Sequence, residues 1–176
     1  YAQGYAVKSA EYLARRYKVT YQNFGVSGSR VVDVLATQLP EAMALRPDIV
    51  LIGIGANDVT HLTDPTDINR DMRTIVDGLY AVNPNVKIII TGSPQMGSVP
   101  RFPQPAKWLA TQRTTLVNKV MYKVAADKKL VVAPIAEKTG PVFAAHPELF
   151  AKDKFHPTTD GYKLWVKVIN DALTDL

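Results

Sequence analysis

Hydrophobic residues recur along much of the chain at the three- and four-residue spacing that is typical of helices packed on one face. This spacing predicts five helices, at residues 3–17, 31–45, 68–79, 109–124 and 164–173. Proline lacks the backbone N–H that a helix interior needs, so we expect a bend near Pro40 and a helix end before Pro47. The pair at residues 83–84, Asn then Pro, should likewise end the third helix.

Four other segments have the pattern of strands. Continuous apolar runs at residues 49–54 and 86–91 are typical of parallel strands buried on both faces, and residues 130–133 form a shorter run. Residues 19–24 alternate in polarity, which predicts an edge strand with one exposed side. Because helices alternate with these strands, the pattern predicts an α/β fold whose parallel sheet is covered by helices on both faces.

The composition is ordinary for a globular protein and changes this picture little, so we expect one domain over residues 1–176. The sequence has no cysteine, which excludes disulfides and thiolate metal sites. The formal net charge of +5 is spread over several predicted helices, which indicates solvated helix faces and no nucleic-acid partner. No apolar run approaches the roughly 20 residues that a membrane-spanning helix requires, so no transmembrane segment is expected.

Candidate chemistry is concentrated in segments that follow predicted strands or precede the last helix, and these can converge at one edge of the sheet. Asp153 and His156 are three residues apart in a predicted turn. That spacing lets the carboxylate accept a hydrogen bond from the imidazole and leaves the other ring nitrogen as a base. A helix-capping loop with no catalytic role is the alternative interpretation of this segment.

Two further residues have the chemistry of an oxyanion hole. Asn57 follows the apolar strand at 49–54, and its side-chain amide could donate to a developing negative charge, while Asp58 should hold the loop. Gly28 lies in a strand-to-helix loop, where its backbone N–H could do the same. Both positions are also compatible with simple turns. Ser27 and Ser29 flank Gly28, but the string is G-x-S-G and lacks the G-x-S-x-G spacing of a nucleophile elbow.

Three blocks in this order resemble the SGNH (GDSL) hydrolase family, of the small bacterial lipase and esterase type. They are N-F-G-V-S-G, G-A-N-D-V-T-H, and F-H-P-T-T-D-G-Y-K-L-W preceded by Asp153. The resemblance covers nearly the whole chain and implies a flavodoxin-like three-layer α/β/α fold with a parallel sheet of order 2-1-3-4-5. It also implies that Gly28 and Asn57 are oxyanion donors, that His156 is the general base, and that Asp153 orients it.

The sequence departs from the family at one point, because the Gly-Asp-Ser motif that carries the nucleophilic serine after the first strand is absent. We therefore expect the domain to be N-terminally incomplete, with the first, central strand and the serine on a segment that is omitted from this sequence, cleaved but still bound, or disordered. An extra peptide or an open slot should then lie between residues 19–24 and 49–54. The 176 residues alone should be inactive. The cellular location is undetermined, with export favoured over the cytoplasm.

The functional expectation is a serine ester hydrolase that acts on small acyl esters or thioesters and needs no cofactor or metal. A carbohydrate acetylesterase and a non-catalytic binding module on the same fold are the alternatives. A metal site at Asp58, Asp153 and His156 is a further alternative, which the lack of a His pair at ligand spacing disfavours. Residues 93–107 form a long loop that could line an acyl pocket or simply pack, with candidate residues Met96, Val99, Phe102 and Trp108. His61 and His146 are expected to be surface or packing residues.

Overall fold

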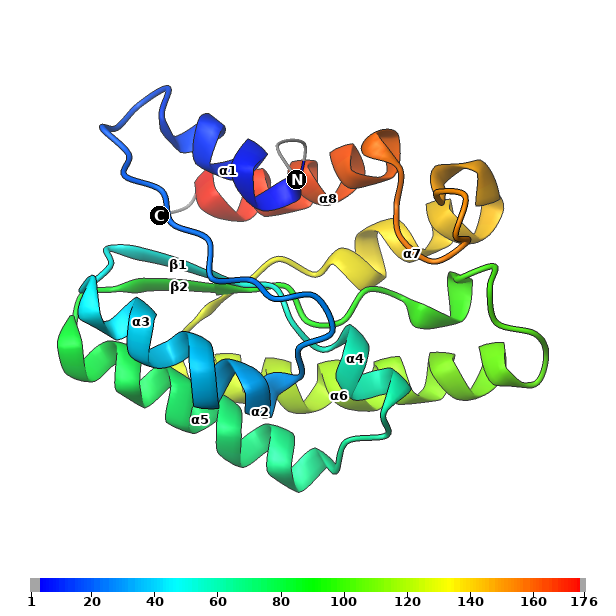
Figure 1. Ribbon diagram of the computed structural model, residues 1–176, viewed down its shortest axis with the longest axis horizontal. Helices are drawn as coiled ribbons and strands as arrows, with labels where there is room; N and C mark the ends of the chain where they lie inside the picture. Colours follow the sequence, from blue (N-terminus) through cyan, green and yellow to red (C-terminus); the bar gives the residue numbers. More distant parts are fainter. Residues whose placement is uncertain (1–3, 175–176) are drawn as a thin grey trace.

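The computed structural model describes residues 4–174, which form a parallel sheet of order β1-β2-β3 with helices on both faces (Figure 1). The strands are β1 (Ile49–Ile52), β2 (Lys87–Ile90) and β3 (Val131–Val132), with Ile49 opposite Lys87 and Ile89 opposite Val131. The α-helices are α1 (Tyr5–Leu13), α2 (Val31–Asp33), α3 (Leu39–Ala44), α4 (Ala56–Thr60), α5 (Pro65–Val82), α6 (Ala106–Lys128), α7 (Ile135–Ala145) and α8 (Thr159–Thr174). Shorter helical turns are η1 (Val34–Gln38), η2 (Met96–Ser98) and η3 (Pro147–Leu149).

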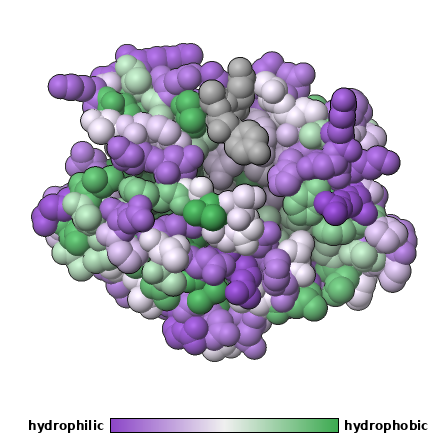
Figure 2. All heavy atoms as spheres, in the orientation of Figure 1, coloured by the Kyte–Doolittle hydropathy of each residue, from purple (hydrophilic) through white to green (hydrophobic). Residues whose placement is uncertain are grey.

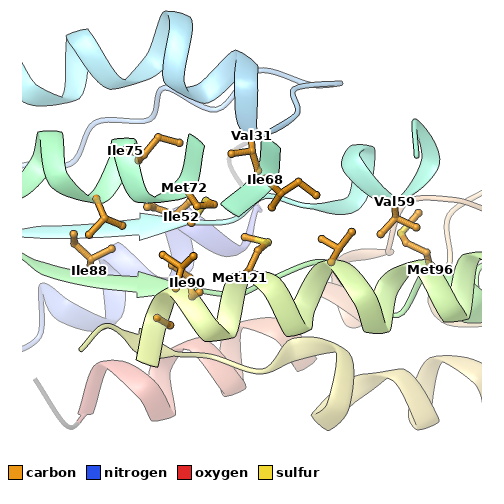
Figure 3. Close-up of a cluster of buried hydrophobic side chains, with 14 of the residues drawn as sticks. Val31, Ile52, Val59, Ile68, Met72, Ile75, Ile88, Ile90, Met96 and Met121 are labelled. Atoms are coloured by element: carbon orange, nitrogen blue, oxygen red, sulfur yellow. The ribbon is translucent and has the colours of Figure 1, made fainter. Parts of the chain in front are cut away.

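Helices α1 and α8 pack side by side on one face of the sheet, and α3, α5 and α6 lie on the other (Figure 1). The larger core lies between the sheet and α5 and α6, where Ile68, Met72 and Met121 are fully buried against Ile52 and Ile90 of the strands (Figure 3). Hydrophilic residues cover much of the outer surface seen in Figure 2, with hydrophobic residues in small groups among them. This is the three-layer α/β/α arrangement, so the predicted fold class is confirmed.

The five predicted helices are present, one of them in modified form, and two further helices, α4 and α7, were not predicted. The helix expected at 31–45 is divided into α2, the π-helical turn η1 and α3, and Pro40 lies in the first turn of α3, where a helix tolerates proline. Helix α7 was not predicted, because Ile135, Ala136 and Phe143 are its only buried apolar residues and do not form a clear helical pattern. In the described residues, no helix has the length and apolar character needed to cross a membrane.

The strand predicted at residues 19–24 is wrong. This segment has no regular secondary structure and is mostly exposed, and no backbone hydrogen bond joins residues 14–30 to β1 in the described part of the chain. An extended segment becomes a strand only when a neighbour satisfies its backbone N–H and C=O groups. The alternating polarity of residues 19–24 was therefore insufficient to form a strand without such a neighbour.

Strand β1 has one free edge. Lys87 N–H donates to Asp48 O and Thr91 N–H donates to Ile52 O, so alternate residues of this strand face β2. Because the backbone N–H and C=O groups of successive residues point to opposite edges of a strand, those of Ile49 and Leu51 face away from β2. Within residues 4–174 nothing pairs with that edge. The full strand order 2-1-3-4-5 stays a prediction, since the observed strands account for three consecutive neighbours.

Candidate functional site

A pocket of about 410 Å³ lies at the carboxyl ends of β1 and β2 and brings together three of the four residues singled out from the sequence. Gly28, Asn57 and His156 all line it, together with residues that directly follow the two strands. The loops after parallel strands meet at this edge of an open α/β sheet, which is why segments far apart in the chain converge here. Asp153, the fourth residue, stands behind His156 and contacts it directly.

The Asp153–His156 pair is built into a tight turn. Asp153 Oδ2 lies 2.6 Å from His156 Nδ1, and its Oδ1 accepts the backbone N–H groups of Phe155 and His156 at 3.0 and 3.1 Å. Lys154 adopts a left-handed conformation (φ 55°) at the centre of this turn. The carboxylate is therefore fixed by the backbone at one oxygen and orients the imidazole with the other, which leaves Nε2 as the ring nitrogen available for chemistry.

The turn is anchored on both sides. Ala151 N–H donates to His156 O at 2.7 Å, and Thr158 N–H donates to Leu149 O at 2.7 Å. The Thr158 hydroxyl accepts the N–H of Gly161 in the first turn of α8, at 3.2 Å, so it caps that helix. These hydrogen bonds hold the segment from Asp153 to Thr158 in one defined turn.

The carboxyl of Asp153 should titrate at an unusually low pH. The hydrogen bond to His156, followed by those from the Phe155 and His156 backbone, lowers its pKa from 3.8 to about 2. The folded state then binds fewer protons than the unfolded chain between these values, so this carboxyl stabilises the fold above pH 4 and that contribution is lost as the pH falls toward 2. An NMR titration of the Asp153 carboxyl carbon measures the midpoint. In His156→Ala it should move back toward 3.8, and an unchanged midpoint would show that the turn alone depresses it.

Asn57 sits in the first turn of α4, with its amide directed toward the loop that carries Gly28. Its Nδ2 donates to Ser29 O at 2.9 Å, which uses one of the two amide hydrogens. No hydrogen bond within residues 4–174 uses the second. Gly55, the N-cap just before α4, has φ 117°, and a Cβ there would lie 3.0 Å from Ser93 N, so only glycine allows the sharp turn from β1 that aims Asn57 at the pocket.

Asp58 holds the start of α2, just after the loop that contains Gly28. Gly28 has φ 87°, a conformation that favours glycine, and its N–H forms no hydrogen bond in the described residues. Asp58 is fully buried, and its carboxylate accepts the N–H of Val31 at 3.2 and 3.4 Å. Burial raises the pKa of this carboxyl. Asp58 thus ties α4 to the start of α2 and holds the Gly28 loop beside Asn57, as the sequence analysis expected.

The other two histidines lie outside the pocket. His61 Nδ1 lies 2.9 Å from Asn57 O at the end of α4, and His146 Nδ1 lies 2.8 Å from Glu148; both side chains are exposed. Among residues 4–174, no group of three His, Cys, Asp or Glu side chains is placed to hold a metal ion. Asp58 in particular is committed to the Val31 N–H.

The serine hydroxyls near the pocket are engaged elsewhere or unconnected to the imidazole. Ser29 Oγ accepts from Gln38 Nε2 at 3.0 Å, and Ser98 Oγ donates to Gln95 O at 2.7 Å. Ser27 lines the pocket on the Gly28 loop. Across residues 4–174, no serine forms a hydrogen bond with His156. Within the described residues, the imidazole therefore has no serine hydroxyl as a hydrogen-bond partner.

The long loop at residues 93–107 contributes to the pocket in part. Met96 and Val99 are buried and line it, while Phe102 packs edge-on to Phe155 with ring centroids 6.0 Å apart. Trp108 is 64% exposed and does not line the pocket. Sequence reasoning missed the aromatic wall opposite, which Tyr5, Phe143 and Trp165 supply from α1, α7 and α8. Its only sequence signal was the aromatic content of the predicted first and last helices.

Comparisons of the sequence with known proteins found a family and a curated relative that match this chain. Residues 1–164 match the GDSL-like Lipase/Acylhydrolase family. The GDSL-like esterase Rv1075c of Mycobacterium tuberculosis is 29% identical over 131 residues, which cover 73% of this chain and 41% of that protein. This chain thus spans about two fifths of the length of that curated relative.

Solved structures share the fold. The lipase/acylhydrolase from Enterococcus faecalis superimposes with a TM-score of 0.75 at 21% identity, covering 97% of this chain and 85% of the other. A variant of the acetyl-xylooligosaccharide esterase Axe2 from Geobacillus stearothermophilus has the same TM-score and identity, with coverages of 97% and 80%. The match over nearly the whole sequence, together with the pocket that unites its three blocks, shows that this chain belongs to the GDSL-like lipase/acylhydrolase family of hydrolases.

Proposed function

We propose that the protein is a serine ester hydrolase in which Asp153 orients His156 and in which Asn57 and Gly28 form the oxyanion hole. The observation that carries the proposal is the 2.6 Å bond between Asp153 Oδ2 and His156 Nδ1 at the wall of a pocket that Gly28 and Asn57 also line. The Gly28 N–H and the second amide hydrogen of Asn57, neither of which has a partner among residues 4–174, thus share a pocket with an oriented base. That combination serves acyl transfer, in which negative charge develops on a carbonyl oxygen.

The mechanism follows from these positions. His156 Nε2 takes the proton of the serine hydroxyl as its oxygen attacks the ester carbonyl carbon. Negative charge moves to the carbonyl oxygen, where the Asn57 amide and the Gly28 N–H stabilise it. The alcohol then leaves with the proton from His156, and an acyl-serine remains. Water then attacks this ester as His156 takes its proton, and the acid is released as the serine oxygen takes that proton back from His156.

The serine itself is proposed to lie outside residues 1–176, on a strand that pairs with the free edge of β1. The backbone groups of Ile49 and Leu51 point to that edge without partners in the described residues. A strand there would end beside the loops that begin at Gly53 and Gly28, at the same edge of the sheet as His156. Buried unpaired backbone groups cost about 1–3 kcal/mol each, so occupation of this edge would also stabilise the domain.

Small acyl esters or thioesters are the proposed substrates. The buried side chains of Met96 and Val99, with the aromatic wall of Phe143 and Trp165, give the pocket an apolar lining suited to an acyl chain. Acetylated carbohydrate is the second candidate, since the structural neighbour Axe2 is named for that activity. A series of p-nitrophenyl esters of increasing chain length separates them, because a strong preference for acetate would favour the carbohydrate esterase.

A fluorophosphonate probe tests the proposed function on the full-length protein. We expect stoichiometric covalent labelling of one serine outside residues 1–176, mapped by mass spectrometry, and no ester hydrolysis by the 176-residue chain alone. Labelling at Ser27, Ser29 or Ser98 would refute the proposed position of the nucleophile. The absence of both labelling and ester hydrolysis in the full-length protein would favour a non-catalytic binding module on this fold.

A further inference from the structure

We infer that Arg101 recognises an anionic group, a phosphate or a carboxylate, on the alcohol portion of the ester substrate. The inference rests on the ester hydrolysis proposed above and names a substrate class for it. Arg101 belongs to the loop between η2 and α6 and lines the same pocket as His156. It is remote from β1 in the chain and takes no part in the proposed acyl-transfer steps.

The arginine is attached to the turn that carries the base. Its backbone N–H donates to Lys154 O at 3.1 Å, which joins the loop to the Asp153–His156 turn. Its guanidinium carbon lies 5.9 Å from the centroid of the Phe155 ring, and that ring is 5.0 Å from the His156 ring. Phe102 packs edge-on to Phe155 and helps to hold it in place. The Phe155 ring thus neighbours both the guanidinium and the imidazole.

The charge of Arg101 is not neutralised within the protein. Across residues 4–174, its guanidinium forms no hydrogen bond or ion pair, and its one side-chain interaction is with the face of Phe155. Asp153 is the acidic residue of the turn to which the Arg101 backbone is bonded, and both of its carboxylate oxygens already accept hydrogen bonds from His156 and the turn backbone. Lys152 and Lys154 flank that acid, are exposed, and form no ion pairs among the described residues. The rim beside His156 is therefore positively charged.

The position of Arg101 assigns it to the alcohol portion of the substrate. The departing alcohol oxygen must lie within hydrogen-bond reach of His156 Nε2 to receive its proton, so the alcohol occupies the His156 side of the pocket. Arg101 is on that side, whereas Met96 and Val99 are buried in the interior where the acyl chain is proposed to bind. A planar guanidinium supported on an aromatic ring presents a fork of donors that matches phosphate or carboxylate oxygens.

The test compares acetate esters that share an aromatic alcohol core and differ in charge. These are 4-acetoxybenzoate and 4-acetoxyphenyl phosphate, each set against neutral methyl 4-acetoxybenzoate. In the full-length protein, Arg101→Gln should lower the ratio of kcat/KM for anionic over neutral ester by about five- to tenfold, mainly through KM. Arg101→Lys should restore part of this ratio, because it keeps the charge and loses the fork. The two anions show whether phosphate or carboxylate is preferred.

Arg16→Gln is the matched control, since the Arg16 guanidinium lies at the same 5.9 Å from an aromatic ring, that of Tyr12, outside the pocket. It should leave the ratio unchanged. Hydrolysis of all three esters with equal ratios in wild type and Arg101→Gln would overturn the anion site alone. An NMR titration with phenyl phosphate provides a readout without catalysis. Binding that is lost in Arg101→Gln, combined with no hydrolysis of any ester, would keep the anion site and refute the proposed function.

Discussion

Replacing His156 with alanine in the full-length protein lowers kcat for ester hydrolysis by about 10⁴- to 10⁶-fold, the range seen when the base of a Ser-His pair is removed from a serine hydrolase. The imidazole is the only base whose orientation is fixed by a carboxylate at the pocket wall among residues 4–174, through the 2.6 Å bond from Asp153. Without it, the serine proton has no acceptor during attack, and the alcohol has no donor as it leaves. Initial rates with p-nitrophenyl acetate measure the loss.

His146→Ala is the control for this variant. His146 is also exposed and also bonded to a carboxylate, that of Glu148 at 2.8 Å, but it does not line the pocket. It should retain wild-type kcat within about twofold, as surface substitutions away from special features change little. Because the His156 side chain is 58% exposed, the midpoint of thermal unfolding should fall only slightly in His156→Ala, through the lost hydrogen bond to Asp153, and should stay near that of wild type in His146→Ala. Retained hydrolysis in His156→Ala would eliminate the proposed base.

The helical periodicity of the chain was sufficient to predict most of the fold. The stripe of Ile68, Met72 and Ile75 forms the buried face of α5, and the apolar runs beginning at Ile49 and near Lys87 form β1 and β2. These are elements whose burial on one or both faces imposes a strict sequence pattern. The segment at 19–24 had such a pattern and is not a strand, because strand formation depends on a partner whose presence local sequence does not encode.

The candidate site was predictable where a local spacing carries the chemistry. Asp153 and His156 form their bond within one turn, so their three-residue separation contained the geometry. The contributions of Arg101 and Phe143 were not predictable, since each reaches the pocket through packing between elements distant in sequence. The positive φ angles of Gly28 and Gly55, 87° and 117°, were also not predictable, because glycine allows such angles but many glycines in loops do not adopt them.

Replacing Asn57 with alanine lowers kcat by about 10²- to 10³-fold and changes KM little, because an oxyanion donor acts on charge that appears only in the transition state. The expected effect rests on the amide hydrogen of Asn57 that has no partner within the described residues, at a pocket that also contains His156. Asn57→Asp should be at least as severe, because a carboxylate offers no donor and repels the oxyanion. Steady-state kinetics with one neutral ester separates kcat from KM.

A structural explanation for such a loss must be excluded, since Asn57 Nδ2 also donates to Ser29 O at 2.9 Å and so helps to hold the Gly28 loop. Gln38→Ala provides the matched control, because Gln38 Nε2 donates to the hydroxyl of the same Ser29 at 3.0 Å without lining the pocket. If loop support alone mattered, the two variants would lose similar activity. If Asn57 stabilises the oxyanion, Gln38→Ala keeps kcat within a few fold while Asn57→Ala does not, and labelling by the fluorophosphonate slows in Asn57→Ala alone.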